Sequence, residues 1–286
     1  MITRRCAQRQ FLLRPSKEVN QLFLYALAYA AERFSIDVHA FCVLSNHYHL
    51  IVTDRGGELP EFLHWLNGTV ARALNAYHGR WENFWAPGSY SAVELVEQKD
   101  VIEKILYVLV NPVAAGLVSD AAEWPGLRSS PRDIGERLEV ERPRFFFRQN
   151  GSLPDCVALN ITRPGAVRDS DEAFARLVES RLIAKETQVR ANLANQQRKF
   201  LGKRDVLEQS IYERPKNPEP RRRLNPRVAC RDKWNRIEAL KKYQEFLKQY
   251  RLALRSFCEG LRDALFPRGT YWMRVHFHAR CAAAPP

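Results

Sequence analysis

The sequence has no long hydrophobic run. Its longest early apolar stretch, Leu22 to Ala31, is well short of the roughly 20 apolar residues that cross a bilayer as a helix. Residues 1–20 carry charges throughout, which is unlike a secretory signal peptide. We therefore expect a cytoplasmic protein with no membrane partner.

Closely spaced cysteines are also lacking. None of the six cysteines belongs to a Cys-x-x-Cys pair, so the sequence indicates neither a zinc knuckle nor a disulfide framework. We expect reduced thiols at Cys6, Cys42, Cys156, Cys230, Cys258 and Cys281.

The first half of the chain lacks the positive charge that characterises the whole. Residues 1–140 hold 14 Lys and Arg against 16 Asp and Glu, residues 141–286 hold 31 against 16, and the whole chain carries +13. Excess positive charge attracts phosphate backbones regardless of sequence. The C-terminal half is therefore a candidate nucleic-acid surface, although a solvated basic surface has the same composition. The length of 286 residues with 45% hydrophobic residues suffices for one or two domains.

Two histidines, His47 and His49, stand one residue apart at the start of an apolar run. The preceding run, Val38 to Leu44, is rich in β-branched and aromatic residues, and a Ser-Asn pair separates the two runs. This pattern predicts a β-hairpin. Side chains alternate along a strand, so both imidazoles point to one face and can hold one metal ion. On this segment alone, ordinary polar residues on a half-exposed strand are the slightly favoured explanation of the pair.

A helix is predicted from about residue 98 to residue 110. The apolar stripe that this helix would bury is complete without Tyr107. Tyr107 lies about 150° from the centre of the stripe, so a core role for Tyr107 is disfavoured. Lys104 and Asn111 share the face of Tyr107 because positions three and four apart are neighbours. Pro112 disfavours helical geometry at the residue before it, so we expect Asn111 at a frayed helix end with a free side chain. The stripe consists of Ile102, Ile105, Leu106 and Leu109.

Strands and helices alternate in the first half of the chain. This order predicts an α+β fold with a ferredoxin-like (RRM-like) antiparallel sheet and helices packed against it. Farther on, the sequence predicts a basic, mostly helical extension with a Pro- and Arg-rich linker near residues 213–227. The expected strands span residues 9–13, 38–52 (as the hairpin), 91–96 and 144–148, and the expected helices residues 17–33, 59–77, 98–110, 172–200 and 234–265.

The two motifs together carry a family resemblance. The segments Ser-Asn-His-Tyr-His-Leu-Ile-Val, from Ser45, and Tyr-Val-Leu-Val-Asn-Pro-Val-Ala-Ala-Gly-Leu-Val, from Tyr107, resemble the signature blocks of the REP-associated tyrosine transposases. These belong to the HUH endonuclease superfamily and act on single-stranded DNA. The resemblance covers roughly residues 1–130. It implies a catalytic domain at residues 1–135, with residues 136–286 as the basic extension.

The resemblance also implies roles for individual residues. His47, His49 and Asn111 would bind a divalent ion, and Tyr107 would attack a DNA phosphate. Nitrogen and amide-oxygen ligands with open positions suit Mg²⁺ or Mn²⁺, which would polarise the phosphoryl oxygens. Lys104 could steady the phosphate, although a solvent-facing lysine is an equal explanation. The implied partner is single-stranded or hairpin DNA, bound by a monomer or a homodimer, with the tyrosine in its own site or in the partner's.

Three functions remain open at this point. The first is a metal-dependent endonuclease and strand transferase that cuts stem-loop DNA through a 5′-phosphotyrosine intermediate. The second is a domesticated nucleic-acid-binding protein in which cleavage does not matter. The third is a His-metal phosphoesterase without a covalent step.

Other side chains are weaker candidates. His276 and His278 repeat the His-hydrophobe-His pattern but lack a following tyrosine helix, so we expect them to have no metal role. Trp81, Phe84 and Trp85 could stack on bases, although we expect core packing for at least two of the three.

Overall fold

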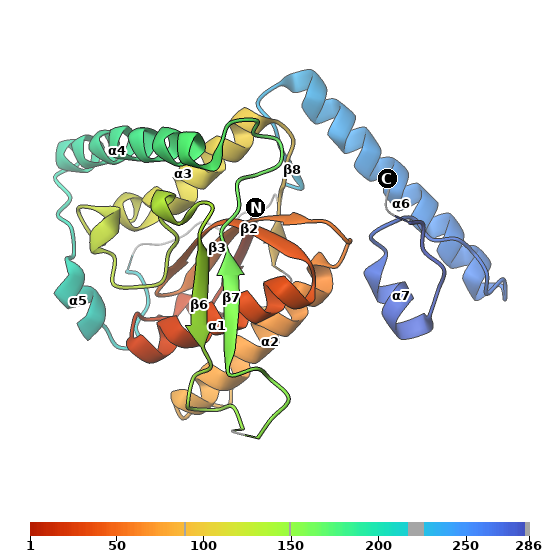
Figure 1. Cartoon of the computed structure of the whole chain (residues 1–286), viewed down its shortest axis with the longest axis horizontal. Coiled ribbons are helices and arrows are strands. Elements are labelled where there is room, and N and C mark those ends of the chain that lie inside the picture. Colours follow the sequence, from red (N-terminus) through yellow and green to blue (C-terminus); the bar gives the residue numbers. More distant parts are fainter. Residues whose placement is uncertain (89, 149, 217–225, 284–286) are drawn as a thin grey trace.

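The computed structural model describes residues 1–286 except 89, 149, 217–225 and 284–286. A four-stranded sheet lies at its centre, with the strand order β2-β3-β1-β4 and antiparallel pairing throughout (Figure 1). The element order β-α-β-β-α-β with this strand order is that of a ferredoxin-like α+β fold, so the predicted fold class is confirmed. The strands are β1 (Ile2–Arg5), β2 (Ile36–Leu44), β3 (His47–Asp54) and β4 (Ser91–Ala92).

Helices cover both faces of the sheet. On one face, the Tyr48 ring contacts Phe23 of α1 (Lys17–Arg33) at 5.2 Å between centroids, and its hydroxyl donates to Asn67 of α2 (Leu59–Tyr77). On the other face, the next residue, His49, contacts Tyr107 of α3 (Gln98–Ala114). Adjacent strand residues point to opposite faces, so α1 and α2 form one layer and α3 lies in the other.

The first strand lies elsewhere than predicted. The sequence placed it at residues 9–13, whereas β1 spans Ile2–Arg5 and pairs with β3 from Ile2↔Leu50 to Arg5↔His47. A short 3₁₀ helix, η1 (Ala7–Arg9), follows, and positive φ values at Gln8 and Arg9 turn the chain off the sheet. Leu12 and Leu13 are buried all the same. Their apolar character therefore reflects core packing rather than a strand.

The strand predicted at residues 91–96 is divided into two. Its first part, β4, pairs with β1, and its second part, β5 (Glu94–Leu95), pairs in parallel with β8 (Val228–Ala229) far along the chain. Val93 between them donates its amide to the carbonyl of Met1. One sequence run thus connects the central sheet to the C-terminal region.

The residues after 130 add a hairpin and further helices. The hairpin of β6 (Arg137–Glu141) and β7 (Cys156–Asn160) replaces the strand expected at residues 144–148, and its inward residues Val140 and Val157 join the main core. That core starts at Ile2 and continues to Val206. The boundary near residue 135 stays a prediction. Helices α4 (Asp171–Asn195) and α5 (Lys203–Glu208) follow the hairpin.

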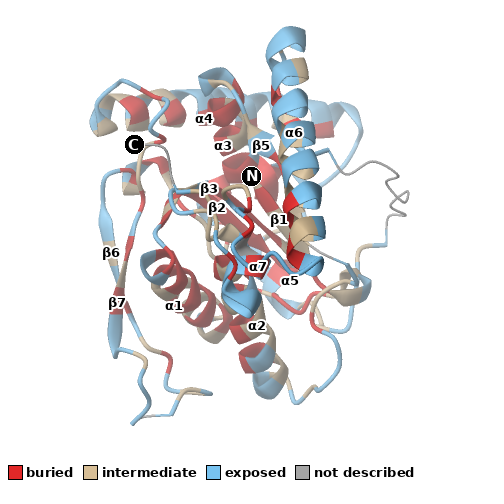
Figure 2. Ribbon diagram, turned by 90° about the vertical axis from the view of Figure 1, so that its right-hand side faces the viewer, coloured by how far each residue is buried: buried red, intermediate tan, exposed pale blue. Residues whose placement is uncertain are grey.

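The last two helices stand apart from the main core. Helix α6 (Lys233–Cys258) extends beside the body and is largely exposed (Figure 2). Together with α7 (Tyr271–Phe277) it buries a small cluster of its own around Phe257 and Phe266. The predicted linker at residues 213–227 falls mostly on residues outside the described part of the chain. Among the described helices, none combines the length and the apolar character that a membrane crossing requires.

Candidate functional site

The two histidines of β3 lie side by side on the face that α3 covers. Their ring centroids are 4.8 Å apart with an interplanar angle of 87°. Thr3 and Arg5 of β1 are the strand partners of His49 and His47, respectively, and share this face. The hairpin turn and the strand alternation therefore place both imidazoles where the sequence predicted them.

Asn46 fixes the tautomer of His47. The Asn46 carboxamide nitrogen donates to the carbonyl of Arg9 at 3.3 Å, so its oxygen is the atom that lies 2.7 Å from His47 Nδ1. A carboxamide oxygen accepts only, and Nδ1 therefore carries the proton. The lone pair of neutral His47 is then on Nε2. Such an outer partner is the usual way in which a protein orients a metal-binding histidine.

His49 has a buried ring nitrogen whose hydrogen-bonding capacity is unused. Its Nδ1 lies 2.7 Å from the Thr3 hydroxyl, while Nε2 is buried and has no hydrogen-bond partner among the described residues. Burial, together with His47 and Arg5, keeps the pKa of His49 well below its ordinary value, so the ring is neutral at physiological pH. Buried polar atoms nearly always have partners. An unpartnered Nε2 beside a second imidazole therefore fits a bound metal ion.

Tyr107 lies beside the histidine pair of its own chain. Its ring centroid is 5.4 Å from that of His49, and Lys104 Nζ is 5.6 Å from the Tyr107 ring centroid. The Tyr107 side chain is 43% exposed, whereas Ile105 and Leu109 on the other side of α3 are buried. The structure thus supports the expectation that Tyr107 is not a core residue.

Asn111 differs from its prediction. Helix α3 does not fray before Pro112 but continues to Ala114, and Asn111 is 8% exposed. Pro112 lies in the last helical turn, where its missing N–H costs one ladder bond, and Val113 beyond it is buried in the core. Asn111 therefore shares the face of Tyr107 as a buried helical residue, one turn farther from the helix start.

The three aromatic candidates for base stacking differ in how exposed their rings are. Phe84 is buried, and Trp85 packs on Tyr48 and donates its ring N–H to the carbonyl of Asn67, on the face opposite His49. Trp81 is 90% exposed. The structure leaves Trp81 as the accessible ring of the three.

The repeated His-hydrophobe-His pattern near the C-terminus does not form a similar pair. His276 lies in helix α7 and packs on Trp272 at 3.7 Å between centroids, and His278 follows as the left-handed cap of that helix. Elsewhere, His39 of β2 is buried and bonds to Thr162 and Thr53. None of these three rings joins the pair on β3.

Sequence reasoning missed the residues that orient the histidines. Thr3 comes from a strand that was predicted in the wrong place, and strand pairing alone brings it to His49. Asn46 lies in the predicted turn, directly before His47. That adjacency was the signal that could have identified Asn46 as the residue that orients the His47 ring. A polar turn residue with a carboxamide can bond to its neighbour's ring as well as close the turn.

A comparison with protein families covers the histidine pair and Tyr107 of this site. Residues 2–107 match the family of IS200-like transposases, a segment that includes both histidines and ends at Tyr107. This match confirms the resemblance inferred from the two motifs. A solved structure described as a REP-associated tyrosine transposase bound to a REP hairpin is 21% identical, with a TM-score of 0.37, over 46% of this chain and 76% of that one. No curated protein matches the sequence.

Proposed function

We propose that this chain, which has an IS200-like transposase segment at residues 2–107, is a metal-dependent endonuclease and strand transferase that acts on single-stranded or hairpin DNA. The observation that carries the proposal is the grouping of His47, His49 and Tyr107, with an unpartnered ring nitrogen on His49. His47, His49 and Asn111 would hold Mg²⁺ or Mn²⁺. When bound, such an ion offsets the charge of a phosphodiester and polarises its oxygens.

Tyr107 supplies the nucleophile. Its phenol loses a proton to solvent, the phenolate oxygen bonds to phosphorus, and the bond from phosphorus to the 3′ oxygen breaks. The leaving strand takes up a proton as a 3′ hydroxyl, and the other strand stays attached to Tyr107 through its 5′ phosphate. Attack by a 3′ hydroxyl reverses the step, so strands can be rejoined without ATP.

Lys104 lies close enough to assist Tyr107. An ammonium 5.6 Å from the ring centroid stabilises the negative charge that the phenol oxygen acquires, and it can contact the phosphate that approaches the ring. The half-exposed position of Tyr107 leaves room for a DNA strand on this side of α3. The basic residues of the C-terminal half add attraction for the rest of the DNA backbone.

Covalent capture tests the proposal. Purified protein is mixed with labelled DNA hairpins and Mn²⁺, and denaturing electrophoresis detects a protein–DNA adduct. Tyr107→Phe is expected to abolish the adduct and to leave DNA binding within about twofold. Tyr77→Phe is the matched control, because Tyr77 is 45% exposed on another helix, and it should capture as the wild type does. An adduct that persists in Tyr107→Phe would contradict the assignment.

The same experiment separates the two rival functions. A nucleic-acid-binding protein without cleavage would bind hairpins with or without chelator and give no adduct; the exposed basic helix α6 is the observation in its favour. A metal phosphoesterase without a covalent step would cut DNA even with Phe at position 107. Loss of both cutting and capture on chelation, and in His49→Ala, supports the transferase.

A further inference from the structure

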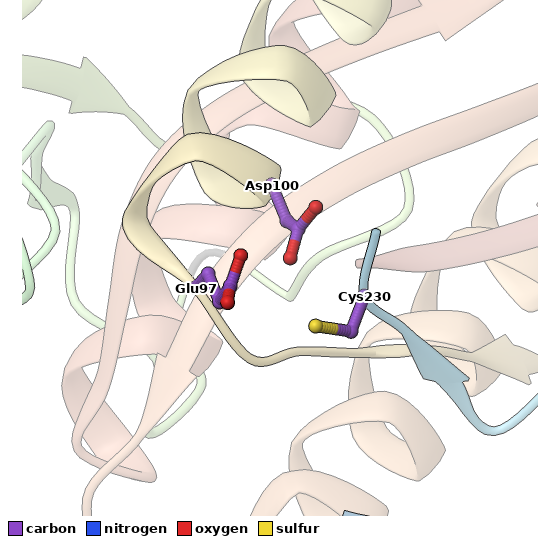
Figure 3. A group of neighbouring side chains, drawn as sticks. All are labelled: Glu97, Asp100 and Cys230. Atoms are coloured by element: carbon purple, nitrogen blue, oxygen red, sulfur yellow. The ribbon is translucent and has the colours of Figure 1, made fainter. Parts of the chain in front are cut away.

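A second cluster of metal-binding side chains lies at the start of α3. Glu97 caps the helix, Asp100 is in its first turn, and Cys230 follows β8. One ligand atom from each residue lies within 4.8 Å of the others, and Figure 3 shows the three side chains converging on one point. Two neighbouring carboxylates therefore meet a thiol that lies more than a hundred residues farther along the sequence.

The surrounding chain holds this cluster together. The parallel pairing of β5 with β8, through Glu94↔Val228 and Leu95↔Ala229, brings the segment before Cys230 to the segment before α3. The backbone N–H of Arg231 donates to Asp100 Oδ1 at 3.3 Å, and the side chain of Arg231 forms an ion pair with Glu103. The geometry of the cluster is therefore set by contacts on both sides of it.

One buried oxygen in the cluster, Oδ2 of Asp100, has unused hydrogen-bonding capacity. Asp100 is 5% exposed, and its Oδ2 atom has no hydrogen-bond partner among the described residues. Cys230 is 7% exposed, forms no disulfide, and its thiol lies within hydrogen-bonding range of the Asp100 carboxylate and the backbone of Asp232. Placing a carboxylate oxygen in a buried site without a partner is costly. A cation between Asp100 and Cys230 would remove that cost.

Glu97 completes the donor set. Its carboxylate lies 2.9 Å from the exposed Lys99 ammonium and accepts a hydrogen bond from the Asn235 carboxamide. These hydrogen bonds, first from Lys99 and then from Asn235, lower the pKa of Glu97, so it is ionised at neutral pH. Burial and the nearby carboxylates raise the pKa of the Cys230 thiol.

We propose that Glu97, Asp100 and Cys230 bind a zinc ion, with water as a fourth ligand. A thiolate with two carboxylates suits Zn²⁺, whereas Mg²⁺ and Mn²⁺ prefer oxygen ligands. On binding, the Cys230 thiol releases its proton to solvent and the sulfur bonds to the metal. The ion would fasten the segment around Cys230 to α3, the helix that carries Tyr107. This site is separate from the histidine pair and does not depend on the proposed nuclease activity.

Cobalt substitution tests the zinc site directly. The full chain is purified with His47→Ala and His49→Ala, so that the histidine pair cannot bind, and is titrated with Co²⁺. The expected result is a thiolate-to-cobalt charge-transfer band that saturates at one equivalent and that Zn²⁺ displaces. Cys230→Ser should lose the band. Cys258→Ser, which alters an exposed cysteine, should keep it. A missing band, or a band that Cys230→Ser retains, would overturn the proposal.

Thermal unfolding provides a second readout, and its deciding comparison, with and without Zn²⁺, needs only the background protein to fold. In the same histidine-free background, one equivalent of Zn²⁺ is expected to raise Tm by a few degrees. Asp100→Asn keeps the shape of the side chain and should reduce the shift at least by half. An unchanged Tm on adding Zn²⁺ to the background protein would count against the site.

Discussion

The carboxamide oxygen of Asn46 accepts a hydrogen bond from Nδ1 of His47, and it thereby determines which ring nitrogen of His47 carries the proton. Replacing Asn46 with Ala removes the acceptor for Nδ1–H, so the ring can change tautomer and turn its lone pair away from the neighbouring imidazole. We expect the affinity for Mn²⁺ to fall by about 10- to 100-fold, with unchanged far-ultraviolet circular dichroism. Isothermal titration calorimetry measures the affinity, and Asn195→Ala on the exposed end of α4 is the control. Equal affinity for the two variants would show that Asn46 does not orient the histidine.

His39 makes the stability of the fold depend on pH. Burial lowers its pKa, and its neutral ring donates to the carbonyl of Thr162 and accepts from Thr53. The unfolded chain binds the proton more readily, so the free energy of unfolding falls as the pH drops below about 6.5. We expect urea denaturation to give lower stability at pH 5.5 than at pH 7.5.

A variant tests the contribution of that one ring. His39→Gln keeps polar atoms at the position but cannot titrate, so it should lower the stability at pH 7.5 and reduce the difference between the two pH values. His64→Gln replaces an exposed histidine and should leave the difference unchanged. Equal pH dependence in His39→Gln and wild type would assign the effect to the other two histidines whose pKa burial lowers, the buried His49 and the half-buried His78.

Helix α6 has more exposed Lys and Arg residues than any other described helix. Lys241, Lys248, Arg251 and Arg255 fall within a narrow arc at 100° per residue, and all four are exposed. Changing them to Gln should weaken binding to single-stranded DNA by at least tenfold at low salt. It should also reduce the slope of log affinity against log salt by up to about 0.7 per lost phosphate contact.

Fluorescence anisotropy across a salt series measures that slope. Lys185 and Arg181 on α4, changed to Gln together, provide a control with exposed charge on another helix. A slope that remains the same after the four α6 substitutions would mean that the helix does not contact the DNA backbone.

Local sequence patterns predicted some elements well and others not at all. The helices at residues 17–33 and 59–77 have the predicted bounds, because an amphipathic stripe and a Ser16 cap are local signals. The first strand was predicted in the wrong place because the segment at residues 11–13 is more apolar than Ile2 and Thr3. Only the pairing with β3 decides which of the two segments forms the strand. The β6–β7 hairpin was missed for a similar reason. Its two strands, of alternating polar and apolar residues, are defined by their pairing with one another.

The candidate site shows the same division. The histidine pair and Tyr107 follow from strand alternation and helix spacing, which are local. Thr3, the partner of His49, comes from a segment that only tertiary pairing brings near. In the separate cluster at the start of α3, no spacing rule connects Cys230 to Asp100 across their distance in sequence. Asn111 was placed correctly on its face, but its burial depends on how the end of α3 packs.

The molecule as a whole has cores of unequal size. The main core extends from Ile2 to Val206, whereas α6 and α7 share a cluster of six buried residues around Phe266. Fewer buried contacts give a lower free energy of local opening. We expect amides of residues 264–282 to exchange with deuterium at least 100-fold faster than those of α1. Hydrogen-exchange mass spectrometry on the intact protein measures this, and equal protection would indicate one cooperative unit.

The pairing of β5 with β8 also has a consequence for the order of events during synthesis. A ribosome adds roughly 5–20 residues per second, so on the order of ten seconds pass between the emergence of Leu95 and that of its partner Ala229. The ferredoxin-like sheet can fold within that interval, with the edge of β5 open. The start of the tyrosine helix therefore gains these neighbours only after Ala229 has been translated.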